Sequence, residues 1–101
     1  MHAFAALADP TREGILNALA VRPRTVNEVV ALFPITQPAI SRHLKVLREA
    51  GLVTVVPTGK TRVYHLDPAP LREIDRWLDR YRRFWADRLD ALESFMDEEP
   101  E

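Results

Sequence analysis

Apolar residues recur at helical spacing along most of the chain, and short polar breaks separate the helical segments. An apolar run at residues 2–8 predicts a short helix. Asp9 followed by Pro10 predicts the start of a second helix, because aspartate caps free backbone N–H groups and proline fits the first turn. This helix is expected to reach residue 20, although Gly14 inside it is unfavourable by about 1 kcal/mol relative to alanine. Its predicted buried residues are Ile15, Leu16 and Leu19.

A third helix is predicted after a loop at residues 22–24. Thr25 and Glu28 have the spacing of a capping box, so a short helix should begin there. The pattern places its end near residues 33–34. Its expected buried residues are Val26, Val29 and Val30.

The fourth helix has both of its ends marked in the sequence. Thr36 is a candidate N-cap, and Gly51 is the expected stop after a helix that ends near Ala50. About four residues separate this helix from the preceding one, which is the spacing of a helix-turn-helix. The sequence therefore predicts that motif.

A strand pattern follows Gly51. Residues 52–56, which are rich in valine, and residues 61–66 are two β-prone runs. They flank a glycine-containing turn at 57–60, which predicts a β-hairpin, or wing. Pro68 then opens a helix expected to run from about Ala69 to Met96. Such a helix is about 42 Å long, too long for so small a domain to cover, so a second copy of the chain is the simplest partner. The apolar stripe consists of Leu71, Ile74, Leu78, Tyr81, Trp85, Leu92 and Phe95, is interrupted by Arg88, and is widened by Trp77 and Phe84.

Length and pattern together predict one winged-helix domain over residues 1–101, mainly α with a small β-hairpin. Its expected parts are an N-terminal helix at 1–8, the helix-turn-helix and wing at 9–66, and a C-terminal helix at 67–97. A frayed tail is expected at 98–101, where the sequence is acidic and contains a proline.

The net charge of −1 hides an uneven distribution. Residues 1–66 carry eight Lys or Arg against four Asp or Glu, a net charge of +4. Residues 67–101 carry six Lys or Arg against eleven Asp or Glu, a net charge of −5. The basic part is suited to a polyanion, but two solvated surfaces of opposite sign would give the same distribution.

Several classes of protein are not supported by the sequence. No segment approaches the roughly 20 apolar residues that span a bilayer, and no signal-peptide pattern opens the chain. The chain has no cysteine, which excludes disulfides and thiolate sites. It contains neither a glycine-rich phosphate loop nor a nucleophile–base arrangement. We therefore expect a cytoplasmic protein that is not an enzyme, has no catalytic residues, and contacts no membrane.

The fourth helix is amphipathic in a way that suits DNA. Ile40, Leu44 and Leu47 share its apolar face, and polar or basic groups lie opposite. Most solvated helices also have a polar face. The order of capped helix, turn, basic helix, glycine stop and basic hairpin is what favours a DNA-reading element. The residues predicted to bind double-stranded DNA are Thr36, Gln37, Pro38, Ser41, Arg42, Lys45, Lys60, Thr61 and Arg62.

Three segments closely resemble the ArsR-type winged-helix repressors, and the resemblance covers roughly residues 3–96. They are LADPTR at 7–12, ITQPAISRHLKVLREAGLV at 35–53, and GKTRVYHL at 59–66. The resemblance implies a homodimer that binds a pseudo-palindromic operator, usually for repression and often of its own gene. It also implies that the helices at 1–8 and 67–97 are dimerisation helices, which form the interface. On this chain that interface consists of Phe4, Leu7, Leu71, Ile74, Leu78, Tyr81, Trp85, Leu92 and Phe95.

The chain departs from the metal-sensing members of that family. Their cysteines would fall where this sequence has Val29-Val30-Ala31-Leu32, and the helix after Pro68 has no histidine. Zinc needs about four N, S or O ligands around one point, so we predict no metal and no cofactor and place the chain in the metal-independent branch. His2, His43 and His65 are scattered, and His43 is expected to pack or hydrogen-bond.

Two alternatives remain at this stage. The aromatic residues of the last helix could line a small-molecule pocket instead of forming interface core. A winged-helix protein-interaction module that does not bind DNA would also fit the near-zero net charge and the acidic last helix. The sequence identifies no small-molecule or protein effector.

Overall fold

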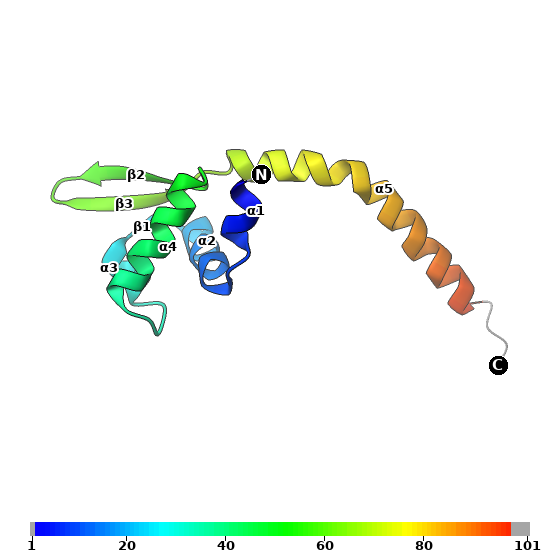
Figure 1. Ribbon diagram of the computed structural model, residues 1–101, viewed down its shortest axis with the longest axis horizontal. Helices are drawn as coiled ribbons and strands as arrows, with labels where there is room; N and C mark the ends of the chain where they lie inside the picture. The colour runs from blue at the N-terminus through cyan, green and yellow to red at the C-terminus, as the bar shows by residue number, and fades with distance from the viewer. Residues whose placement is uncertain (1, 98–101) are drawn as a thin grey trace. The chain divides into compact units, whose positions relative to one another are not determined.

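The computed structural model describes residues 2–97, which form five helices and a small sheet (Figure 1). This agrees with the predicted mainly α fold with a β-hairpin. The chain divides into two compact units, with the boundary between Leu71 and Arg72, and we describe each unit by itself. The tail predicted at 98–101 lies outside the described residues. The elements are α1 (His2–Leu7), α2 (Pro10–Val21), β1 (Arg24–Thr25), α3 (Val26–Val30), α4 (Gln37–Glu49), β2 (Val53–Thr58), β3 (Thr61–Leu66) and α5 (Ala69–Asp97).

Helix α2 begins as its sequence predicts. The Asp9 carboxylate accepts hydrogen bonds from the backbone N–H groups of Thr11 at 2.8 Å and Arg12 at 3.1 Å. These bonds satisfy two of the donors that a helix leaves free at its start. The predicted core positions of α2 are confirmed, since Ile15, Leu16 and Leu19 are all buried.

The Asp9 cap makes stability depend on acid. The hydrogen bond from the Arg12 N–H is the main cause that lowers the pKa of Asp9 below its ordinary value of 3.8, and the Thr11 N–H adds to it. A carboxylate whose pKa is lowered by folding stabilises the folded protein at pH values above its pKa in the unfolded chain. That stabilisation is lost as the pH falls through 3.8 and below. Asp9→Asn keeps an acceptor oxygen but cannot titrate. We therefore expect it to lose less stability than wild type between pH 7 and pH 3 in urea denaturation.

The sheet is three-stranded and antiparallel, in the order β1-β3-β2. Strand β1 corrects the prediction of a loop at residues 22–24. Arg24 pairs with Tyr64 and Thr25 pairs with Val63. A two-residue strand is too short to show a strand pattern of its own, so only the partner strand β3 defines it.

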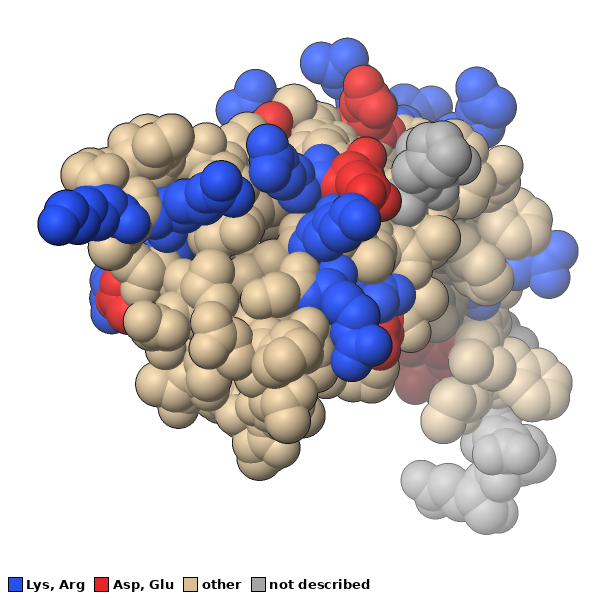
Figure 2. Space-filling model, turned by 60° about the vertical axis from the view of Figure 1, so that its left-hand side comes forward, with Lys and Arg blue, Asp and Glu red and all other residues tan. Residues whose placement is uncertain are grey.

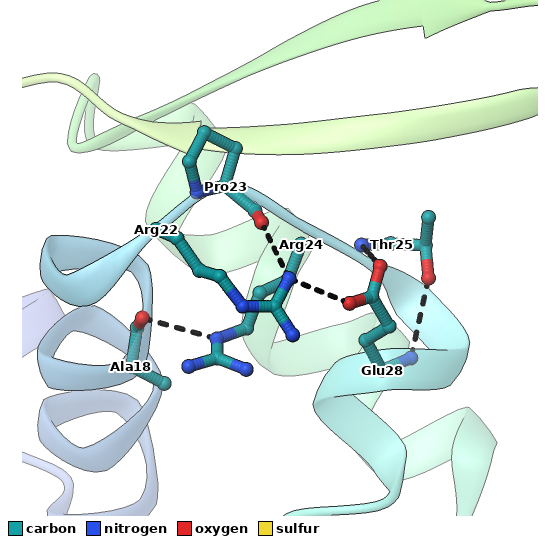
Figure 3. A network of polar contacts seen from close by, with 6 residues as sticks. All are labelled: Ala18, Arg22, Pro23, Arg24, Thr25 and Glu28. Atoms are coloured by element: carbon teal, nitrogen blue, oxygen red, sulfur yellow. Dashed lines mark hydrogen bonds and ion pairs between the residues drawn. The ribbon is translucent and has the colours of Figure 1, made fainter.

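A polar network fixes the junction between β1 and α3 (Figure 3). The predicted capping box is confirmed, because Thr25 Oγ1 accepts from the Glu28 N–H and Glu28 Oε1 accepts from the Thr25 N–H, both at 3.2 Å. Glu28 Oε2 also accepts from Arg22 Nη1 at 2.7 Å, and this contact is the main cause that lowers the pKa of Glu28. Arg24 Nε donates to Ala18 O at 3.1 Å. Helix α2, strand β1 and helix α3 are therefore joined at one place.

Helix α3 is shorter than its sequence predicts. It ends at Val30 instead of near residues 33–34, because the Leu32 N–H donates to Val29 O at 3.0 Å and the Phe33 N–H to Val30 O at 3.4 Å, a tighter pattern than that of an α-helix. Of its three valines only Val29 is fully buried, whereas Val26 and Val30 are half-buried. Residues 31–36 therefore connect α3 to α4, a longer turn than the predicted one.

Phe33 in this turn explains the glycine inside α2. A Cβ atom built on Gly14 would lie 2.8 Å from Phe33 Cε1, closer than real Cβ contacts come. The ring therefore packs directly on the backbone of α2. Glycine has no Cβ, so it allows this close approach, at the cost in helix propensity noted from the sequence.

The hairpin has a tighter turn than predicted. Strand β2 runs through Pro57 to Thr58, so only Gly59 and Lys60 lie between the strands. Proline is tolerated here because β2 is an edge strand of the sheet. Gly59 has a φ of 62°, which suits the first position of a two-residue turn.

Helix α5 spans the predicted range and leaves an apolar surface on the single chain. Its large apolar side chains from Trp77 onward are 37–66% exposed, whereas Ile74 is buried. Arg88 lies 4.4 Å from the centroid of the Phe84 ring, which accommodates the one charge within the stripe. Within residues 2–97 no helix is both long enough and apolar enough to cross a membrane. The exposed set is Trp77, Leu78, Tyr81, Phe84, Trp85, Leu89, Leu92, Phe95 and Met96.

Candidate nucleic-acid interface

Helix α4 is anchored by one face and exposed on the other. Ile40, Leu44 and Leu47 are buried, as predicted from their spacing. The Thr36 hydroxyl caps the helix by accepting from the Ala39 N–H at 3.4 Å. The predicted contact residues on this helix that are exposed to solvent are Gln37, Pro38, Ser41, Arg42 and Lys45.

The C-terminal end of α4 determines where the hairpin begins. Gly51 has a φ of 77°, and the Leu52 N–H donates to Leu47 O at 2.9 Å. The Gly51 N–H donates to Arg48 O at 3.0 Å, which completes a Schellman motif. Leu52 is fully buried by this turn. The predicted glycine stop is confirmed, and it leads the chain directly into β2.

Arg12 braces α4 against α1. Its Nε donates to Ala6 O at 2.7 Å and its Nη2 donates to Ala5 O at 3.4 Å. Its Nη1 lies 3.4 Å from Nδ1 of His43, which is half-buried on α4. His43 therefore has the hydrogen-bonding role expected of it. The brace involving Arg12 was not predicted, because residues 31 apart in the chain give no local pattern.

The wing carries its basic residues at the turn. Lys60, Thr61 and Arg62 are all exposed, and Thr61 Oγ1 donates to Thr58 O at 2.9 Å. In the described part of the chain neither Lys60 nor Arg62 has an ion-pair partner. Their charges are therefore available to an external anion.

The sheet brings the wing beside the start of α4. A hollow of about 270 Å³ lies between them, and it includes four of the predicted DNA-binding residues: Gln37, Lys60, Thr61 and Arg62. Arg42 and Lys45 lie further along α4, outside the hollow, and Lys45 has Glu49 at 4.0 Å. Figure 2 shows basic side chains gathered on the near face, with fewer acidic ones between them. The hollow is also lined by Thr25, Val26 and Asn27, which sequence reasoning missed.

The sequence of the helix-turn-helix matches a known family. Residues 9–55, from the Asp9 cap to the middle of β2, match the model described as "Bacterial regulatory protein, arsR family". A relative in Mycobacterium tuberculosis (strain ATCC 25618 / H37Rv), the HTH-type transcriptional regulator Rv2034, is 43% identical over 97 residues. The match covers 96% of this chain and 88% of that protein. The chain belongs to the arsR family.

Two further comparisons extend this assignment. The transcriptional repressor SdpR of Bacillus subtilis (strain 168) is 32% identical over 75 residues, which are 74% of this chain and 83% of SdpR. The structure of an ArsR-like transcriptional regulator from Rhodococcus sp. RHA1 superimposes with a TM-score of 0.74 at 33% identity, covering 93% of this arsR-family chain and 89% of the other. The winged-helix fold is therefore shared with solved members of the family.

Proposed function

We propose that this arsR-family chain is a homodimeric transcriptional repressor that binds a pseudo-palindromic operator in double-stranded DNA. The observation that carries the proposal is α4, which is held by three fully buried residues and presents polar and basic side chains beside the basic wing. An α-helix fits the major groove, where guanidinium and amide groups distinguish base pairs. Arg42 and Gln37 are the side chains we assign to base contacts.

The wing supports a different kind of contact. Lys60 and Arg62 stand on a short hairpin and can reach phosphate or an adjacent minor groove. Such contacts fix the position of the protein without selecting sequence. In this proposal α4 supplies specificity, and the wing supplies affinity that depends on salt.

A second copy is the partner we assign to α5. Nine large apolar side chains of this helix are exposed on the single chain. Scattered single apolar residues are normal on a protein surface, but a set of this size on one helix indicates an interaction surface. Phe4 and Leu7 on α1 are assigned to the same interface. A two-fold dimer would place its two α4 helices in successive major grooves, about 34 Å apart.

We infer that this regulator does not sense metal through the inherited family sites. Val29-Val30-Ala31-Leu32 provide no cysteine ligand, and the α5 segment 69–97 contains no histidine. In the described residues no three His, Asp or Glu side chains come together as a metal site would need. The donor chemistry of this chain therefore does not fit the metal group of its metal-sensing relatives.

Fluorescence anisotropy with duplex DNA from upstream of the protein's own gene tests the proposed function. We expect saturable binding that is stronger than to a scrambled duplex and that weakens as salt rises. The absence of salt-sensitive binding at micromolar protein would contradict the proposal. That result would favour a protein-interaction module that keeps the fold without binding DNA.

The wing has a test of its own. Lys60→Ala should weaken binding to specific and scrambled duplexes by similar factors, because a phosphate contact is independent of sequence. The slope of log affinity against log salt should fall by roughly 1, since one fewer counterion is released. An unchanged slope would remove Lys60 from the phosphate contacts. Thr54→Ala on β2, outside the hollow, is a control that leaves every charge in place.

A further inference from the structure

The hollow beside the start of α4 has one wall from the start of α3 and another from the wing. Thr25, Val26 and Asn27 form one wall, and Lys60, Thr61 and Arg62 form the other. Pairing of Thr25 with Val63, the neighbour of Arg62, ties the two walls together. The strand β1 that the sequence did not reveal is therefore what builds this site.

The charges around the hollow are unbalanced. Lys60 and Arg62 are both cationic, and no acidic side chain among residues 2–97 lines the hollow. The nearest candidate in sequence is Glu28, but its two carboxylate oxygens already accept from Arg22 and from the Thr25 N–H. The site therefore offers uncompensated positive charge to an anion.

Neutral donors stand on the α3 wall. The Asn27 side chain is exposed and makes no hydrogen bond within residues 2–97, so its amide N–H groups are free to donate. The Thr25 hydroxyl accepts from the Glu28 N–H and also interacts with the Glu28 carboxylate, so it is already used within the protein. The Thr61 hydroxyl is already used, because it donates to Thr58 O. Cations on one wall thus face the amide donors of Asn27 on the other.

We propose that this hollow binds one phosphate of the DNA backbone, held between Asn27 on α3 and Arg62 on β3, with Lys60 beside them. The proposal rests on the proposed DNA-binding function and deepens it. A phosphate oxygen accepts from both a guanidinium and an amide, so one phosphate can satisfy both walls. Gln37, the first residue of α4, lines the same hollow, so this phosphate would set where α4 enters the major groove.

A double-mutant cycle on the full chain tests the shared phosphate. With a duplex that the wild-type protein binds, Asn27→Ala should weaken affinity about fivefold, as for loss of one hydrogen bond, and Arg62→Ala about tenfold. Because both side chains hold the same group, the double variant should lose about tenfold and not the product of the two losses. A scrambled duplex should show the same ratios. Asn17→Ala, an exposed asparagine on α2 outside the hollow, is the matched control and should change nothing.

A second measurement keeps the protein folded and alters the DNA. An uncharged methylphosphonate is placed at each backbone position of the duplex in turn. At one position per half-site, the difference in affinity between wild type and Asn27→Ala should shrink, because the phosphate that Asn27 contacts has lost its charge and one of its two acceptor oxygens. The proposal is overturned if the wild type binds DNA but the two losses multiply or no position narrows the difference between the variants. Failure of the wild type to bind any duplex would instead overturn the proposed function.

Discussion

Trp85→Asp should turn the proposed dimer into a monomer at micromolar protein concentration. Trp85 lies within the apolar stripe of α5, is 59% exposed on the single chain, and makes an edge contact with Phe84 at 5.5 Å between ring centroids. Pairing with a second copy would bury the new carboxylate without a partner. A buried charge without a partner costs about 3 kcal/mol or more. That cost raises the dimer dissociation constant more than a hundredfold. Sedimentation velocity measures the change directly.

Ser94→Asp is the matched control for this experiment. It adds the same charge to the same helix, at an exposed position outside the apolar stripe. We expect this variant to remain dimeric, with an unchanged helix content by circular dichroism. A wild-type monomer, or a Trp85→Asp variant that still dimerises, would show that this face of α5 is not the interface.

Arg42→Ala will reduce affinity for the operator by about 1–3 kcal/mol, because a bidentate contact to guanine contributes that much discrimination. Affinity for unrelated duplexes should fall much less. Arg42 is exposed and forms no ion pair within the described residues, so its loss should leave folding intact. A gel-shift titration with operator and competitor duplexes measures both affinities.

Arg48→Ala distinguishes a base contact from a general loss of charge. Arg48 is also exposed on α4, but it lies in the last turn of the helix, away from the end that is capped by Thr36. We expect Arg48→Ala to weaken operator and competitor binding by similar, small factors. Equal operator affinity for wild type and Arg42→Ala would exclude Arg42 from base readout.

The parts of the fold that the sequence predicted are those with local causes. Asp9 and Thr36 cap their helices through atoms two or three residues away. Gly51 ends α4 by adopting a positive φ, and the buried positions follow from a spacing of three or four residues. Each of these causes lies within one turn of helix, so the sequence alone was sufficient.

The parts that it missed have distant causes. Strand β1 exists because Thr25 pairs with Val63, and Phe33, which follows α3 in the chain, packs on Gly14 of α2. Pro57 could be assigned to β2 only once that strand was known to lie at the sheet edge. Asn27 was missed for the same reason, because its place in the hollow depends on a wing more than thirty residues away.

The DNA contacts and the dimer contacts remain predictions of a different kind. They concern atoms of a second molecule, and a single chain specifies only one side of each. The exposed stripe of α5 and the open charges of Arg42, Lys60 and Arg62 are the features that such partners would cover.

Selection from a random duplex library tests the central claim most directly, because the library contains candidate operators of every sequence. The purified protein should enrich an inverted repeat whose half-sites have centres about 10 base pairs apart, as two α4 helices on a two-fold axis require. Arg42→Ala should relax the selection at one base pair of each half-site. Enrichment of no sequence, or of a motif without inverted symmetry, would contradict a dimeric repressor that reads DNA through α4.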